Sequence, residues 1–172
     1  MKIEKYPRRF LFVALLVGVL PLRGADVAPA PCAFCEIIAG TRPQEAVVYR
    51  DDKVLAFLSI GPRNPGHVLV VPLVHAEGFL DLPPDTLHAM TDAAQKIATA
   101  LKRTDLKMEG FVIQLNTGKA AGQTVFHAHL HIIPRYVGEP EEQKPEPRVP
   151  PDQLALVAAK IKAALAELNA GK

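Results

Sequence analysis

The sequence lacks the features on which several large classes of protein depend. None of its 172 residues is tryptophan and only two are cysteine, so the chain can form at most one internal disulfide. Its amino-terminal apolar run covers only residues 10–20, whereas a helix that spans a bilayer needs about 20 apolar residues. The apolar fraction of 49% is ordinary for a globular protein. The length predicts one domain with a substantial core.

Positive charge is also scarce outside the first residues. The whole chain has a formal net charge of +2. Residues 1–25 alone carry +4, from five basic residues against Glu4, so the remainder holds 15 basic and 17 acidic residues and has a net charge of −2. This balance offers no basic face, and we expect neither DNA nor RNA as a partner.

Residues 1–25 have the order of an export signal. A basic stretch from Lys2 to Arg9 precedes the apolar run, and the small residues Gly24 and Ala25 follow it. The pair Arg8-Arg9 loosely resembles a twin-arginine signal. We expect cleavage near Ala25, an exported protein (periplasmic or extracellular) and no membrane span in the mature chain. Two alternatives stay open: an uncleaved amino-terminal anchor, or a misassigned start codon ahead of a cytoplasmic protein.

Hydrophobic periodicity predicts an α+β domain over residues 32–136, with its helices on one side of an antiparallel sheet. Linkers rich in proline are expected at 26–31 and 137–150, and an amphipathic helix at 151–172. Inside the domain, a short helical turn ends at Gly40 and a long helix opens at Pro83. The segments expected to form about five strands are 46–50, 53–59, 67–72, 111–115 and 125–134.

Three histidines alternate with apolar residues in the last of these strands. They are His127, His129 and His131. A strand places alternate side chains on one face, so a strand here would point all three imidazoles the same way. Imidazole is the side chain best suited to titrate, attack or ligate near neutral pH. A single histidine would usually be a satisfied core residue, but three in register indicate a functional site.

A glycine-rich loop, Asn116 to Thr124, directly precedes the histidines. Glycine allows the backbone to approach a ligand, and backbone N–H groups can cradle a phosphate. The loop is not a Walker A sequence, and by itself it would indicate only a hairpin loop. Its position predicts phosphate-binding donors that face an imidazole nucleophile.

Cys32 and Cys35 form a C-x-x-C pair. Two buried cysteines on a helix, or a disulfide favoured by export, are both compatible with the pair. A thioredoxin-like role is disfavoured, because no βαβ unit surrounds it.

These segments together resemble the histidine triad (HIT) family of nucleotide hydrolases and transferases. The run from Asn116 to Arg135 resembles the family's triad and its Gly-Gln-Thr lead-in. The segment Cys32 to Gly40 resembles the amino-terminal segment, and Pro65 to Pro72 followed by His75 resembles the central strand. The resemblance implies the HIT fold, with a sheet of about five strands, a long helix and, in this chain, an added carboxyl-terminal helix.

The resemblance also implies a mechanism. His129 would attack the α-phosphorus of a nucleoside phosphoramidate or dinucleoside polyphosphate and form a covalent nucleotidyl-histidine that water then hydrolyses. His131, with His67, would hydrogen-bond phosphate oxygens or protonate the leaving group. The residues expected to bind substrate or phosphate are Asn116, Gly122, Gln123, Thr124, His67 and Ser59.

Ser59 departs from the family pattern. Many members carry at this position an acidic residue that grips the ribose hydroxyls, whereas serine makes only one or two neutral hydrogen bonds. A non-catalytic nucleotide-binding or signalling protein is therefore one alternative. A second is a metal-dependent hydrolase with the three histidines as ligands, which is disfavoured because no aspartate lies in or beside the run.

A structural zinc ion and a homodimer complete the expectations from the resemblance. In the zinc-containing bacterial type, Cys32, Cys35, His75 and His127 would form a closed tetrahedral site that leaves His129 free. The helix from Pro83 and the strand from Phe111 would supply the dimer contacts.

Overall fold

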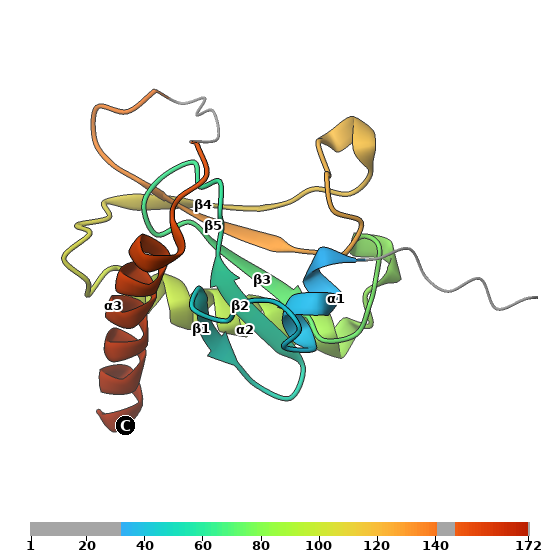
Figure 1. Cartoon of the computed structure of the whole chain (residues 1–172), viewed down its shortest axis with the longest axis horizontal. Coiled ribbons are helices and arrows are strands. Elements are labelled where there is room, and N and C mark those ends of the chain that lie inside the picture. The colour runs from blue at the N-terminus through green and yellow to red at the C-terminus, as the bar shows by residue number, and fades with distance from the viewer. Residues whose placement is uncertain (1–31, 141–146, 172) are drawn as a thin grey trace, which may run out of the picture.

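The computed structural model describes residues 32–140 and 147–171 (Figure 1). The predicted export signal at 1–25, the linker at 26–31 and part of the proline-rich linker lie outside the described residues. Within the described part, no helix is both long enough and apolar enough to cross a bilayer.

Five strands form one antiparallel sheet in the order β1-β2-β3-β5-β4, which confirms the predicted α+β class. β1 and β2 form a hairpin, and the backbone N–H groups of Lys53 and Val54 donate to the Asp51 carboxylate in its turn. β5 lies between β3 and β4, so the histidine run adjoins the central strand. The strands are β1 (Val47–Arg50), β2 (Val54–Leu58), β3 (Val68–Pro72), β4 (Gly110–Leu115) and β5 (Leu130–Arg135).

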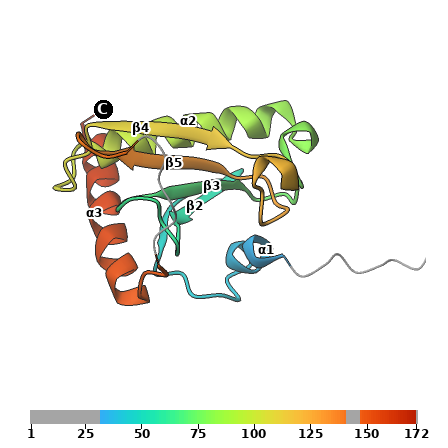
Figure 2. The ribbon, with the colours of Figure 1, turned by 90° about the horizontal axis from the view of Figure 1, so that it is seen from above.

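Helices cover both faces of this sheet. α2 (Pro84–Leu101) and α3 (Pro151–Ala170) pack on one face against Val54, Ala56 and other alternate residues of the strands. α1 (Ala33–Ile38) covers the opposite face, where its Phe34 packs on Phe57 (Figure 2). The prediction that all helices lie on one side is therefore wrong for α1. α1 lies on the opposite face because β2 and β3 are buried along their whole length, so both faces of the sheet must be covered.

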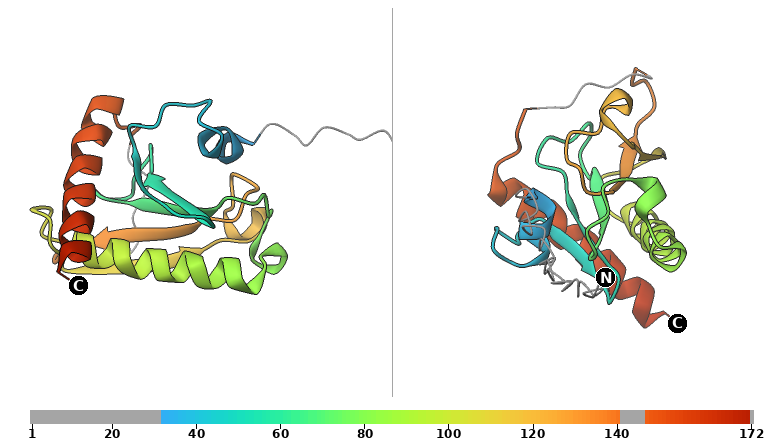
Figure 3. Two further views of the ribbon diagram at one scale, coloured as in Figure 1. Left: turned by 90° about the horizontal axis from the view of Figure 1, so that it is seen from below. Right: turned by 90° about the vertical axis from the view of Figure 1, so that its right-hand side faces the viewer.

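The two long helices follow the predicted apolar stripes. α2 begins with proline in its first turn, where the missing N–H costs nothing. Its buried side chains Met90, Ala94, Ile97 and Leu101 recur at helical spacing. α3 crosses the end of α2 (Figure 3) and places Leu154 and Ile161 in the same core.

The histidine run is only partly a strand. β5 begins at Leu130, and residues 126–129 are irregular, so the predicted strand over 125–134 is wrong in its first half. The reason lies in the backbone hydrogen bonds, because the N–H of His127 donates to Val125 and that of Ala128 donates to Ala76, outside any ladder. Ala128 and Leu130 still enter the core, whereas Phe126 is 48% exposed.

The exposed apolar side chains of the edge strand β4 favour the predicted homodimer. β4 ends the sheet, and its successive residues Phe111, Val112 and Ile113 are 44%, 39% and 46% exposed. Open edges of this kind pair readily with another strand. We propose that β4 joins a second copy of the chain across a two-fold axis.

This proposal predicts a particle with twice the mass of the chain by light scattering at micromolar concentration. Phe111→Glu is expected to give a folded monomer, because a carboxylate between the paired β4 strands would be desolvated at a high cost in free energy. Leu156→Glu is the matched control, since Leu156 is 67% exposed on α3, away from β4. A monomeric parent protein, or equal effects of both substitutions, would contradict the proposal.

Candidate functional site

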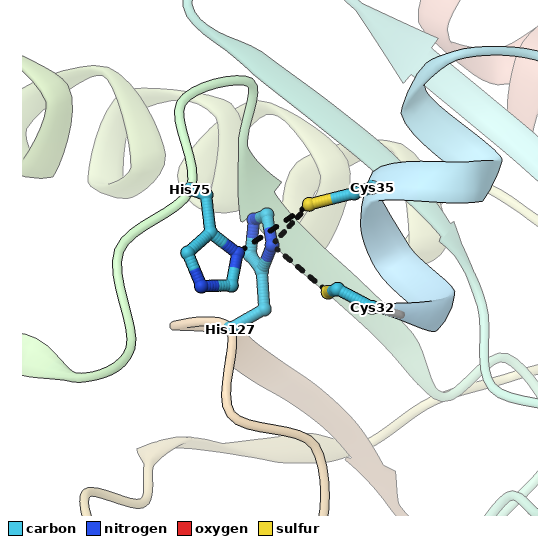
Figure 4. A group of neighbouring side chains, drawn as sticks. All are labelled: Cys32, Cys35, His75 and His127. Carbon is cyan, nitrogen blue, oxygen red and sulfur yellow. Dashed lines mark hydrogen bonds between the residues drawn. The ribbon is translucent and has the colours of Figure 1, made fainter. Parts of the chain in front are cut away.

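Four side chains that the sequence predicts as metal ligands converge beside α1 (Figure 4). Cys32 and Cys35 come from α1 and the residue before it, His75 from the loop after β3, and His127 from the segment before β5. Their ligand atoms all lie within 4.8 Å of one another.

The distances within this cluster fit a zinc ion. The sulfur-to-Nδ1 distance is 3.4 Å for Cys35 and His75, and 3.5 Å from each cysteine to His127. Zinc bonds of about 2.3 Å to sulfur and about 2.0 Å to nitrogen, in a tetrahedron, separate the two ligand atoms by about 3.5 Å. The donor set and its spacing are therefore those of a Cys₂His₂ site.

The tautomer of His127 also fits a ligand role. Its Nε2–H donates a hydrogen bond of 2.9 Å to the carbonyl oxygen of Pro72, which can only accept. Nδ1 is then unprotonated and faces both sulfurs. Burial lowers the pKa of His127 and keeps the ring neutral. Burial raises the pKa of the Cys35 thiol to about 11, with the Cys32 thiol adding to the rise, and a bound cation would favour the Cys35 thiolate.

His129 presents an unprotonated nitrogen. Its Nδ1–H donates a 2.7 Å hydrogen bond to the carbonyl oxygen of His127, which leaves the lone pair on Nε2. Burial lowers the pKa of His129, although the same hydrogen bond opposes the shift. The ring is 5% exposed and stands edge-on to Phe34, with ring centroids 5.2 Å apart. Near neutral pH it therefore has the form of an imidazole nucleophile.

His67 and His131 form an ordered chain of donors and acceptors. The backbone N–H of Arg63 donates to Nδ1 of His67 at 3.1 Å. The proton of His67 therefore lies on Nε2, which is 2.9 Å from Nδ1 of His131 and donates to it. His131 in turn carries its proton on Nε2, where it can donate to a ligand.

Both rings of this pair stay neutral. Burial lowers the pKa of His67 to about 4, and the charge of Arg63 contributes. Burial, followed by the neighbouring histidines and Arg63, lowers the pKa of His131 to about 3. The ring of His131 lies 4.8 Å from that of His129, measured between centroids. Two neutral rings therefore lie next to each other, His131 with a free Nε2–H group and His129 with a free lone pair on Nε2.

The glycine-rich loop is held in shape by Gln123. Its Oε1 accepts the N–H of Gly118 at 2.7 Å, and its Nε2 donates to the carbonyl oxygens of Glu77 and Val125 at 2.6 and 3.1 Å. The amide thus joins the loop to Glu77 and Val125, and the phosphate contact of Gln123 stays a prediction.

The other predicted residues of this loop lie along its rim. Gly122 has a φ of +84°, in the left-handed region that favours glycine. The Asn116 amide donates to the carbonyl oxygen of Ala121 and accepts from Gln114. Thr124 is exposed. The backbone turn and the Asn116 and Thr124 side chains therefore stay candidates for phosphate contact, together with Gln123.

Ser59 lies beside His67 at a pocket of about 190 Å³. Its backbone N–H donates to the carbonyl oxygen of His67 at 2.9 Å. Gln153, Leu154 and Val157 of α3 also line the pocket. The carboxyl-terminal helix, which the sequence suggests to be a separate region, thus borders the predicted ribose position.

Two residues that the sequence does not single out also belong to this site. Arg63 follows Ser59 on the loop between β2 and β3, and its Nη1 lies 3.4 Å from Oε1 of Gln114. Gln114 stands opposite His131 in the β4–β5 register. The only signal in the sequence is that Arg63 lies between two predicted site residues.

The sequence has many relatives with the same domain. Residues 41–138 match the HIT domain. The chain is 49% identical over 113 residues to an uncharacterised HIT-like protein of Methanocaldococcus jannaschii, across 66% of this chain and 85% of that protein. It is 38% identical over 104 residues to the adenylylsulfatase HINT3 of Arabidopsis thaliana, across 60% of this chain and 52% of that protein.

Solved structures agree with this similarity. A zinc-bound histidine triad family protein from Mycobacterium smegmatis has a TM-score of 0.72 and 39% identity, with 82% of this chain and 97% of that chain covered. The diadenosine triphosphate hydrolase of Plasmodium falciparum, solved with cyclomarin A, has a TM-score of 0.65 and 25% identity, with 73% and 80% covered. Since the domain match includes all three histidines and more than half of the chain, the protein belongs to the histidine triad family.

Proposed function

We propose that the chain is a nucleotide hydrolase that cleaves at an α-phosphate through a covalent nucleotidyl-histidine on His129. The observation that carries the proposal is the tautomer of His129, because the Nδ1–H bond to the His127 carbonyl oxygen leaves a buried Nε2 lone pair for attack. Membership of a family that includes an adenylylsulfatase and a diadenosine triphosphate hydrolase supports a nucleotide substrate.

In the first step, Nε2 of His129 forms a bond to the α-phosphorus, and the bond from phosphorus to the leaving group breaks. The leaving group keeps the electron pair and accepts a hydrogen bond from Nε2–H of His131; where it is basic enough to need a proton, it takes one from solvent water. The Asn116 amide, the Thr124 hydroxyl and the backbone N–H groups of the loop would hold the phosphate oxygens as charge develops.

In the second step, water attacks the same phosphorus and the bond to His129 breaks. The electron pair of the broken bond returns to Nε2 of His129, and the proton that the water loses passes to solvent. The products are the nucleoside monophosphate and the free enzyme. His67 takes no proton in this scheme and keeps His131 in the donating tautomer.

The cluster of Cys32, Cys35, His75 and His127 would hold a structural zinc ion apart from this chemistry. All four ligand positions would belong to the protein, so the ion would offer no open position to substrate. It would tie α1 to the segment before β5 and thereby fix the carbonyl oxygen of His127 that orients His129.

The two alternative functions receive less support. A hydrolase with a metal bound by the three histidines needs them to converge, but of these three only His127 belongs to a potential metal group of the described residues. A non-catalytic nucleotide-binding protein is suggested by Ser59, although an oriented nucleophile and donor favour catalysis.

His129→Ala is expected to lower kcat by about 1,000-fold or more, because it removes the atom that forms the covalent bond. The measurement uses adenosine 5′-phosphoramidate and diadenosine triphosphate as substrates, with mass spectrometry of the parent protein to locate the adduct. His88→Ala is the control, since His88 is exposed on α2. Comparable turnover by His129→Ala and the parent would contradict the mechanism, and a parent that binds both nucleotides but cleaves neither would favour the non-catalytic alternative.

The free energy of unfolding is expected to decrease as pH falls from 7 towards 4. The pKa values of His67 and His131, about 4 and about 3, lie below the ordinary value of 6.5. The unfolded chain therefore takes up protons below pH 6.5 while the folded chain does not, and stability that is complete above this pH is lost below it.

Urea unfolding at pH 7, 6 and 5 tests this dependence. His131→Asn should show a shallower loss, because one of the imidazoles with a strongly lowered pKa is gone. A loss of stability equally steep in this variant would assign the pH dependence to other groups.

One zinc ion per chain is expected in the purified protein, with a lower Tm after chelation because the unfolded chain has no preformed site. Elemental analysis and thermal unfolding measure both quantities. His129→Ala should keep its zinc, whereas Cys35→Ser should lose it. A Cys32–Cys35 disulfide without metal, or loss of zinc from His129→Ala, would refute the structural site.

A further inference from the structure

Arg63 reaches from the loop between β2 and β3 to the far edge of the sheet. Its backbone N–H binds Nδ1 of His67, and its Nη1 donates to Oε1 of Gln114 on β4. Gln114 is the cross-strand partner of His131, so the side chains of the two lie on the same face about 5 Å apart. The guanidinium group therefore lies beside the imidazole pair rather than out in solvent.

Gln114 is oriented to receive this arginine. Its Nε2 donates to Oδ1 of Asn116, so Oε1 is left to accept from Arg63. A polar chain thus runs from Arg63 through Gln114 to Asn116, the residue at the start of the glycine-rich loop. This chain connects the guanidinium group to the proposed phosphate-binding rim.

No carboxylate among the described residues pairs with the charge of Arg63. Within the described ranges, no aspartate or glutamate oxygen lies within ion-pairing distance of its guanidinium group. Its side chain is partly buried, and its positive charge reaches both His67 and His131, whose pKa values it lowers. Ser59, at the predicted ribose position, adds no negative charge. A guanidinium group has five N–H donors and is suited to bidentate binding of phosphate.

We propose that Arg63, held by Gln114, binds a second phosphate of the substrate, distinct from the phosphate that His129 attacks. The inference rests on the proposed function and narrows its substrate class to nucleotides with at least two phosphates. The amine that leaves from a phosphoramidate has no negative charge for a guanidinium group to bind. In a nucleotide with a phosphoanhydride bond, the leaving group contains a second, negatively charged phosphate. A phosphate on the ribose would supply the same chemistry.

Binding measurements on the full-length His129→Ala protein test the proposal without turnover. Calorimetry would give the affinities for AMP, ADP and adenosine 3′,5′-bisphosphate. Adding Arg63→Gln should lower the ratio of ADP to AMP affinity by about tenfold, the size expected for a charge-assisted contact. Arg63→Lys should recover part of the ratio of ADP to AMP affinity. Arg103→Gln is the matched control, since Arg103 is exposed near the end of α2 and its loss changes the net charge equally.

Comparison of ADP with adenosine 3′,5′-bisphosphate distinguishes the two possible positions of the second phosphate. A loss confined to ADP places the second phosphate on the leaving-group side, and a loss confined to the bisphosphate places it on the ribose. Equal losses of affinity for AMP, ADP and the bisphosphate would assign Arg63 a structural role and overturn the proposal. Unchanged affinities in Arg63→Gln, or an equal effect of Arg103→Gln, would also overturn it.

Turnover separates this inference from the proposed function. In the protein with His129 intact, Arg63→Gln should lower kcat/KM for diadenosine triphosphate about tenfold relative to that for adenosine 5′-phosphoramidate. If the intact protein cleaves neither substrate, the proposed function fails. If it cleaves both and Arg63→Gln leaves their ratio unchanged, only the role of Arg63 fails.

Discussion

The site depends on one junction, where the segment before β5 is bound to the segment that ends and follows β3. The N–H of Ala128 donates to the carbonyl oxygen of Ala76 at 2.6 Å, and Nε2–H of His127 donates to that of Pro72 at 2.9 Å. These bonds turn His127 towards the two cysteines and leave its own carbonyl oxygen to accept from His129. A single junction therefore separates the three histidines into one ring in the Cys₂His₂ cluster and two rings in the proposed catalytic site.

Desolvation gives the site its chemistry. The imidazoles are buried among one another and against Phe34, which makes a positive charge on any of them costly. Neutral rings leave each proton on one nitrogen, and the backbone hydrogen bonds determine which nitrogen it is. The proposed nucleophile and the proposed donor are thus distinguished by their hydrogen-bond partners, although they are the same kind of side chain.

Much of the fold and the site could be predicted from local pattern. The strand hairpin, the apolar stripe of α2, the glycine-rich loop and the C-x-x-C pair all lie in short stretches whose residues act on their own neighbourhood. The prediction failed where a segment depended on distant partners. Residues 126–129 are not part of the strand, because the N–H of Ala128 donates to the carbonyl oxygen of Ala76. α1 covers the other face of the sheet because β2 is buried on both sides. The phosphate contact of Gln123 stays a prediction, and only the structure shows that its amide also bonds to Glu77 and Gly118.

The sequence by itself determined the types of residue available for chemistry: three alternating histidines, two cysteines at ligand spacing and a loop rich in glycine. These depend on side-chain chemistry and on spacing along the chain, which the sequence contains directly. Only the tertiary structure decided which nitrogen of each imidazole is protonated, that Arg63 reaches Gln114 on a strand 51 positions away, and that α3 borders Ser59. Those outcomes depend on the order of strands in the sheet and on which backbone groups meet, and neither is a local property of the chain.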